Sequence, residues 1–194
     1  MNVRPVTLEG EIVRLEPLRR QHLTELTRIG LVPELWELQP TPVTTPEDMR
    51  AYVIQALSEA EFGSALPFVI VHRPTESLIG STRFADIQRE HRRLEIGWTW
   101  IIPEYQRTKV NTEMKWLLLK HAFEELKAQK VVLKTDLLNT RSRNAIARIG
   151  GVQEGIFRKH VITASGRIRD TVWFGITDDE WPAVQANLLV KLQA

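Results

Sequence analysis

The sequence contains no cysteine among its 194 residues. This absence excludes disulfide bonds, thiolate nucleophiles and cysteine-ligated metal sites, and it fits a reducing compartment. The N-terminal stretch also lacks the apolar core of a signal peptide, and no run approaches the roughly 18 apolar residues that a membrane span needs. We therefore expect a cytoplasmic protein with no membrane partner and no metal.

Neither sign of charge is in large excess. The sequence has 26 lysines and arginines and 24 aspartates and glutamates, which gives a formal net charge of +2. Such a balance provides no basic tail for coating nucleic acid, so any affinity for phosphate must be local. The short basic stretches at 88–93 and 158–160 have no interleaved aromatic residues. We therefore expect no nucleic-acid partner.

Two common phosphate-binding motifs are missing as well. The chain has neither G-x-G-x-x-G nor G-x-x-x-x-G-K-[ST], which argues against Rossmann and P-loop folds. Its hydrophobic content of 43% is enough to bury one substantial core. We expect a single domain over residues 1–194, without internal repeats.

The hydrophobic patterns predict a mixed α/β fold with about seven strands. Strands are expected at residues 9–18, 66–73, 78–87, 94–102, 130–137, 152–163 and 167–177. Helices are expected at 19–30, 46–62, 110–127, 140–150 and 178–192, the second with Thr45 as N-cap and Pro46 in its first turn. The strands at 66–73, 78–87 and 94–102 should pair antiparallel.

Residues 104–127 combine a basic polar segment with an amphipathic helix. The free N–H groups at the start of this helix would lie beside Arg107, Lys109 and the hydroxyl of Thr108. Such a combination binds anions, although the two cations could also merely solvate a loop. The flanking strands favour an anion site, because they place the loop at the carboxyl end of a strand.

Four motifs in this order resemble those of the GNAT superfamily of acyl-CoA-dependent N-acyltransferases. The loop pattern [QR]-x-x-G-x-[GA] reads "QRTKVN", N-x-x-S-x-x-A reads "NTRSRNA", G-[FA]-x-x-E-G reads "GGVQEG", and "RDTVWFGITDDEW" is similar to the family's closing strand and helix. Within the superfamily, the chain is similar to RimJ/RimL-like protein N-terminal acetyltransferases. Departures are Lys109 where glycine is usual, Asn111 where glycine or alanine is usual, and Gly151 where an aromatic residue is common.

The resemblance implies a GNAT fold, whose fourth and fifth strands splay apart, and a site for acetyl-CoA. The family's pantetheine arm would follow the backbone at Ile101 and Ile102 and contact Asn139, while Ser142 would lie near the departing thiolate. The implied coenzyme-binding residues are Ile101, Ile102, Gln106, Arg107, Thr108, Lys109, Val110, Asn111, Thr112, Asn139 and Arg143. Asn139 and Ser142 could also simply cap the helix that follows them.

The general base is predicted from strand alternation. In "LEIGWTWI", Leu94, Ile96, Trp98 and Trp100 would share one face, which leaves Glu95 on a polar strip beside the expected gap. Glu95 could instead be a solvated or ion-paired strand residue, opposite Arg83 or a neighbour. Some relatives carry a glutamate near the position of Val161, so Glu154 and His160 remain alternative bases.

The resemblance implies transfer of an acetyl group from acetyl-CoA to a primary amine by direct attack on the thioester. We expect the acceptor to be the N-terminal α-amine of a protein or peptide. A small-molecule amine and a non-catalytic coenzyme A-binding module are the alternatives, and a homodimer is possible. The proline-rich segment 39–46 and the charged loop 88–93 are expected to border the acceptor site.

Overall fold

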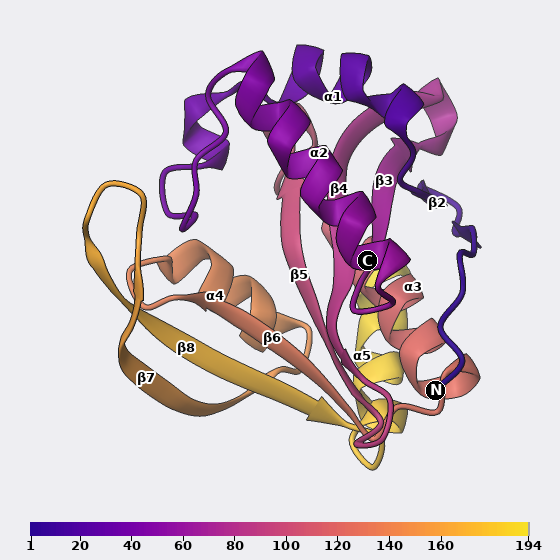
Figure 1. The fold of residues 1–194 in the computed structure, drawn as a ribbon. Helices are drawn as coiled ribbons and strands as arrows, with labels where there is room; N and C mark the ends of the chain where they lie inside the picture. Colours follow the sequence, from indigo (N-terminus) through magenta and orange to yellow (C-terminus); the bar gives the residue numbers. More distant parts are fainter. Residues whose placement is uncertain (194) are drawn as a thin grey trace.

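A computed structural model describes residues 1–193, which form one eight-stranded sheet in the order β1-β2-β3-β4-β5-β6-β8-β7 (Figure 1). All seven predicted strands are present, and a two-residue strand, β1, precedes them. Neighbouring strands are antiparallel except for the parallel pair β5–β6. The strands are β1 Leu8–Glu9, β2 Val13–Pro17, β3 Leu66–His72, β4 Ser77–Gln88, β5 Arg93–Ile101, β6 Lys130–Asp136, β7 Val152–Ile162 and β8 Ile168–Thr177.

Helices cover both faces of the sheet. They are α1 Leu23–Gly30, α2 Pro46–Glu61, α3 Val110–Lys120 with a following π-helical turn His121–Glu125, α4 Thr140–Arg148 and α5 Trp181–Gln193, and short 3-10 helices lie at Arg20–His22, Pro33–Leu35, Arg73–Thr75 and Pro103–Tyr105. One apolar cluster joins α1 and α2 to the sheet, and a second joins α3, α4 and α5 to it. We call the two sides the α2 face and the α3 face. Within residues 1–193, no helix is long and apolar enough to cross a membrane.

The start of α2 shows how local sequence fixes an element boundary. Thr45 Oγ1 accepts a hydrogen bond from Asp48 N at 3.1 Å, and Asp48 Oδ2 accepts one from Thr45 N at 2.9 Å. Pro46 occupies the first helical position, where its missing N–H costs nothing. The predicted cap is confirmed, and it ends the proline-rich segment 39–46 that leads into the helix.

The sheet opens between β5 and β6. Only residues 93–95 of β5 pair with residues 130–132 of β6. Figure 1 shows the two strands starting side by side near the bottom of the view and diverging upward. The predicted splay of the family's fourth and fifth strands is therefore confirmed, with β5 as the fourth strand because of the additional β1.

A β-bulge in β5 changes which face its side chains reach. Arg83 pairs with Gly97 and Ser81 with Trp100, so two residues of β5 lie opposite the single residue between them on β4. Trp98 takes a left-handed backbone with φ of 48°. The predicted alternation is consequently wrong beyond residue 97. Leu94 and Ile96 pack on the α3 face, Trp100 packs on the α2 face, and Trp98 is 41% exposed.

Candidate functional site

The loop before α3 carries backbone N–H groups that are free to bind a ligand. Thr108 Oγ1 donates to Tyr105 O at 2.8 Å and accepts from Val110 N at 3.2 Å. The next two N–H groups, those of Asn111 and Thr112, have no carbonyl partner among residues 1–193. This first turn therefore offers hydrogen-bond donors at the positive end of a helix dipole.

The two cations of the loop have different surroundings. Arg107 is exposed, has a left-handed φ of 60°, and makes no ion pair or side-chain hydrogen bond within the described residues. Lys109 has an ordinary helical backbone, and its Nζ donates to Leu192 O near the end of α5 at 2.9 Å. The left-handed position that favours glycine is thus at Arg107 rather than at Lys109. Arg107 is the cation available to an anionic ligand.

Gln106 connects three elements at the open end of the sheet. Its Nε2 donates to Ile101 O at 2.7 Å, and its Oε1 accepts from Arg141 Nη1 of α4 at 3.0 Å. The N–H of Ile102 is also taken, by Ile79 O at 2.9 Å. The carbonyl of Ile101 keeps one lone pair that could accept a bond from a ligand.

At the start of α4, only one of the two candidate caps, Asn139 and Ser142, caps the helix. Asn139 Oδ1 accepts a hydrogen bond from Ser142 N at 2.9 Å, so Asn139 is the N-cap of α4. The hydroxyl of Ser142 makes no hydrogen bond with any residue that the structure describes, which leaves it available for chemistry. Arg143 lies one residue further, with Nη1 3.4 Å from Leu137 O.

The first turn of α3 is bound to α4 on the α3 face. Arg148 Nη2 of α4 donates to Thr112 Oγ1 at 2.8 Å, and Thr112 is only 2% exposed. The residues expected to hold coenzyme A therefore come from three adjacent elements: the end of β5, the loop 106–112, and the start of α4.

Glu95 lies on the α2 face at the last point where β5 and β6 pair. Its Oε2 is 2.7 Å from Lys134 Nζ of β6, so the glutamate is ion-paired with Lys134 and not with Arg83, which pairs with Glu59. Burial raises the pKa of the Glu95 carboxyl group, and the Lys134 ammonium acts in the opposite direction. A Cβ atom on Gly97 would lie 2.8 Å from Glu95 Oε1, so the glycine leaves room for this carboxylate.

The alternative bases lie elsewhere. Glu154 and His160 belong to β7, the edge strand that β8 separates from β6. Glu154 pairs with Lys130 at 2.6 Å, and His160 Nδ1 lies 3.1 Å from Thr171 Oγ1. Neither lies on a strand that borders the opening, whereas Glu95 does.

Sequence reasoning overlooked two buried charged residues on α3. Glu113 is 4% exposed and Lys115 is 7% exposed, so the helix buries both charged side chains. Lys115 Nζ donates to Thr99 Oγ1 at 3.2 Å, and burial lowers the pKa of its ammonium to about 7. Its spacing of three and four residues from Leu118 and Leu119, both buried, is the signal that could have revealed it.

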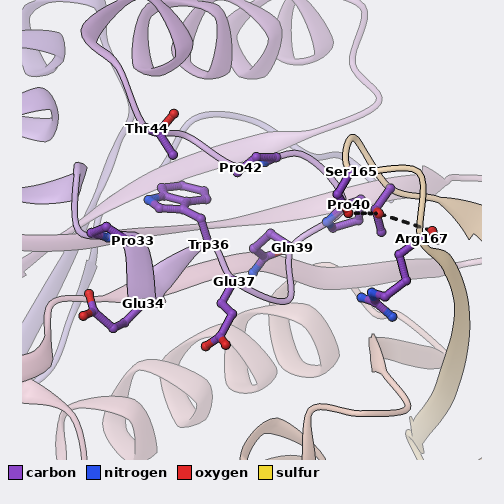
Figure 2. Close-up of a pocket in the computed structure, with 11 residues that line it drawn as sticks. Pro33, Glu34, Trp36, Glu37, Gln39, Pro40, Pro42, Thr44, Ser165 and Arg167 are labelled. Atoms are coloured by element: carbon purple, nitrogen blue, oxygen red, sulfur yellow. Dashed lines mark hydrogen bonds between the residues drawn. The ribbon is translucent and has the colours of Figure 1, made fainter.

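A cavity of about 460 Å³ lies between the loop from α1 to α2 and the turn from β7 to β8 (Figure 2). Ala164 N donates to Pro40 O at 2.9 Å and ties the two loops together. The cavity adjoins both strands of the opening, because Trp36 packs on Trp100 of β5 and Arg167 pairs with Asp136 at the end of β6. The lining residues are Pro33, Glu34, Trp36, Glu37, Gln39, Pro40, Pro42, Thr44, Thr163, Ser165 and Arg167.

The expected border of the acceptor site stays a prediction, and its two segments lie differently relative to this cavity. Part of the proline-rich segment 39–46 lines the cavity, but the loop 88–93 does not. That loop is the tip of the β4–β5 hairpin, where Gln129 N donates to Arg92 O and Arg92 Nε donates to Lys127 O, both at 2.7 Å. The hairpin tip therefore lies at the end of the sheet where β5 and β6 are still paired.

Comparison with protein families assigns the chain to a known family. Residues 13–152 match the acetyltransferase (GNAT) domain family. The chain belongs to the GNAT acetyltransferases, a family of acyltransferase enzymes. The matched range includes β5, the loop before α3, and the start of α4, the three elements that meet at the opening.

Individual relatives agree with this assignment. The chain is 30% identical over 105 residues to YdaF of Bacillus subtilis, provisionally named a ribosomal N-acetyltransferase, but the alignment covers only 54% of this chain and 56% of that protein. A crystal structure from T. thermophilus, provisionally described as an acetyltransferase, is 34% identical, covers 99% of this chain and 100% of its own, and has a TM-score of 0.89. Mycobacterium smegmatis RimJ in complex with CoA-disulfide has the same fold, with 23% identity, coverage of 97% and 95%, and a TM-score of 0.83.

Proposed function

We propose that the protein is an acetyl-CoA-dependent N-acetyltransferase whose acceptor is the N-terminal α-amine of a protein or peptide. The observation that carries this proposal is the opening between β5 and β6, which has a donor-rich loop on its α3 face and a buried carboxylate, Glu95, on its α2 face. One substrate can thus approach from each side, and the two can meet between the strands.

Coenzyme A would bind from the α3 face. Arg107 and the N–H groups of Asn111 and Thr112 would hold the pyrophosphate, while the free lone pair of Ile101 O would accept a bond from the pantetheine arm. The hydroxyl of Ser142 lies on the same side and has no hydrogen-bond partner within residues 1–193, so it can approach the sulfur. The pyrophosphate contact is electrostatic, and its strength should fall as salt increases.

Glu95 would act as the base. An amine attacks a thioester only in its neutral form, so the acceptor ammonium has to lose a proton. Burial raises the pKa of Glu95 and makes it a stronger base, and Lys134 keeps its orientation fixed. An α-amine has a reference pKa near 7.7 to 8.0, about 2.5 units below that of a lysine, which makes it the easier acceptor for a carboxylate base.

The cavity of Figure 2 supports an α-amine acceptor. Glu34 and Glu37 contribute carboxylates to its lining, whereas the charge of Arg167 is balanced by Asp136. In the figure, the side chains of Glu34, Glu37 and Arg167 project to the same side of the view, away from Thr44. The lining thus favours the positively charged N-terminus of a peptide. Because the cavity lies between two loops, the following residues of that peptide would have room.

Acetyl-CoA turnover with peptides that have free N-termini tests the proposal. Glu95→Gln should keep acetyl-CoA affinity within threefold and lower kcat/KM by about 10²-fold at pH 7, with recovery at high pH as free amine accumulates. Glu90→Gln, at an exposed position of the adjacent hairpin, is the matched control and should leave the rate unchanged. Wild-type rates for Glu95→Gln from pH 6 to 9 would exclude Glu95 as the base.

The same assay distinguishes the acceptor classes. If peptides with blocked N-termini and an internal lysine react as fast as free N-termini, the α-amine assignment is wrong. If free amino acids or polyamines are the better substrates, the protein is a small-amine acetyltransferase. Binding of acetyl-CoA without turnover on any amine would identify a coenzyme A-binding module instead.

A further inference from the structure

Lys115 is a buried amine that lacks a counterion. It is 7% exposed, its Nζ has one hydrogen bond, to Thr99 Oγ1 at 3.2 Å, and no carboxylate lies within ion-pair distance of it in residues 1–193. A buried ammonium without a paired charge is costly, and a methionine or leucine would fill the space without that cost. A purely structural role therefore gives a poor account of this residue.

Its position relates Lys115 to the opening of the sheet. Thr99 lies on β5 four residues beyond Glu95, the last residue that pairs with β6. The bulge at Trp98 turns Thr99 to the α3 face, where its hydroxyl contacts Lys115 and, at 2.8 Å, Thr82 Oγ1. The amine is thus beside the unpaired part of β5 on the side proposed for coenzyme A.

The face of α3 that carries Lys115 also faces α4. Thr112 lies one turn before Lys115 on α3, and its Oγ1 accepts the hydrogen bond from Arg148 of α4. Lys115 therefore lies one turn from a residue bonded to α4, and its own hydrogen bond is to β5, the strand whose end the proposed function assigns to the pantetheine arm. The charged group that acts on it is Glu95 of β5, which favours the ammonium form and is itself paired with Lys134 of β6.

We propose that Lys115 is a catalytic residue that donates a proton to the coenzyme A sulfur when the thioester breaks. This inference rests on the proposed N-acetyltransferase function and adds a second proton-transfer group to it. Glu95 removes the first proton from the acceptor ammonium and releases it to solvent, so it is a carboxylate again when the neutral amine forms the new N–C bond. The electron pair of the broken C–S bond stays on sulfur. The Lys115 ammonium protonates the sulfur, and the surplus proton of the new amide nitrogen goes to the Glu95 carboxylate.

Lys115 and Glu95 can both return to their starting protonation states after each reaction. After transfer, Lys115 is a neutral amine and Glu95 is a neutral acid, so one proton moved from Glu95 to Lys115 through solvent restores both. Burial lowers the pKa of Lys115 to about 7, so its ammonium can release a proton near neutral pH, while the charge of a neighbouring thiolate favours the ammonium until transfer. A serine hydroxyl such as that of Ser142 is a far weaker acid, and in this scheme it positions the sulfur.

The test uses Lys115→Met, which removes the amine, and Lys115→Arg, which keeps a charge that cannot lose its proton. Lys120→Met, at an exposed position of the same helix, is the matched control. The first measurement needs no turnover: ultraviolet thiolate absorbance of bound coenzyme A against pH. Wild-type protein should lower the thiol pKa by about one unit relative to free coenzyme A, and Lys115→Met should abolish the shift.

The second measurement is single-turnover acetyl transfer together with coenzyme A affinity. Lys115→Met and Lys115→Arg should both slow transfer by about 10²-fold while affinity stays within threefold, and Lys120→Met should match wild type. A fast Lys115→Arg enzyme would show that charge alone suffices, and a fast Lys115→Met enzyme or a tenfold loss of affinity would also overturn the proposal. A wild-type protein that shifts the thiol pKa but acetylates no amine would instead refute the proposed function, and the catalytic role of Lys115 with it.

Discussion

Glu113 connects helix α3, which follows the loop 106–112, to the N-terminal strands. Its carboxylate accepts three backbone hydrogen bonds, from Glu11 N at 2.9 Å and from Ile12 N and Val13 N at 2.7 Å each. A Cβ atom on Gly10 would overlap the same carboxyl group, so the turn between β1 and β2 closes tightly around it. We predict that this clamp contributes strongly to stability.

The structure gives the magnitude of the effect. A hydrogen bond to a charged group contributes about 1.5 to 3 kcal/mol, and this applies in full to the buried N–H of Val13. The N–H groups of Glu11 and Ile12 are partly buried, so water can replace part of what they lose. Glu113→Ala should therefore lower the free energy of unfolding by about 3 to 5 kcal/mol. In a chain of this size, that change corresponds to a Tm lower by about 6 to 20 °C.

Thermal and urea unfolding measure the effect. Glu113→Gln keeps one carboxamide oxygen as an acceptor and should lose about half as much free energy as Glu113→Ala. Glu125→Ala removes an exposed glutamate from the following π-helical turn and should change stability by less than about 0.5 kcal/mol. A Tm for Glu113→Ala within 3 °C of wild type would refute the reasoning, because it would mean that water satisfies all three N–H groups.

Three further predictions concern the site. Calorimetry should show that Arg107→Ala weakens acetyl-CoA binding about tenfold, whereas Lys109→Ala, which loses only its bond to α5, changes the affinity less than threefold; equal losses would refute this division. Thermal melts and steady-state rates should show that Asn139→Ala lowers stability by about 1 kcal/mol as an N-cap and that Ser142→Ala lowers kcat without lowering Tm; a loss of Tm without loss of kcat in Ser142→Ala would make it a cap. The pKa of Lys115 is depressed on folding, so the unfolded chain binds more protons above pH 7 and stability should rise with pH. Lys115→Met should therefore be more stable than wild type by an amount that shrinks from pH 7 to pH 10 in urea titrations, and a constant difference would contradict the shift.

Regular segments of this fold are predictable because their signals are local. The period of apolar residues identifies all seven longer strands and five helices, and Thr45 with Pro46 fixes the start of α2. The motifs that resemble the GNAT family point to the splayed strand pair, and the structure has that opening. Each of these features depends on residues that are close in sequence or on a pattern of several motifs in a known order.

The details of the site are harder to predict because they depend on a single backbone irregularity and on distant partners. No local sequence pattern predicts that Trp98 adopts a left-handed backbone. This residue nevertheless reverses the sheet faces to which the side chains of Thr99 and Trp100 point. The partner of Lys109 lies 83 residues away on α5, and that of Glu95 lies on β6. The surroundings of such side chains thus depend on residues that are distant in the sequence, which a local pattern does not contain.

The bulge at Trp98 would let one strand serve both sides of the proposed reaction. Glu95 precedes the bulge and reaches the α2 face, where the proposed acceptor would bind, while Thr99 follows it and reaches Lys115 on the α3 face. In a regular strand, positions 95 and 99 would point to the same face, because side chains alternate with a period of two. The extra residue reverses that relation where β5 has left β6. A base for the amine and an acid for the sulfur can therefore approach one thioester from opposite faces without lying side by side, where their charges would neutralise each other.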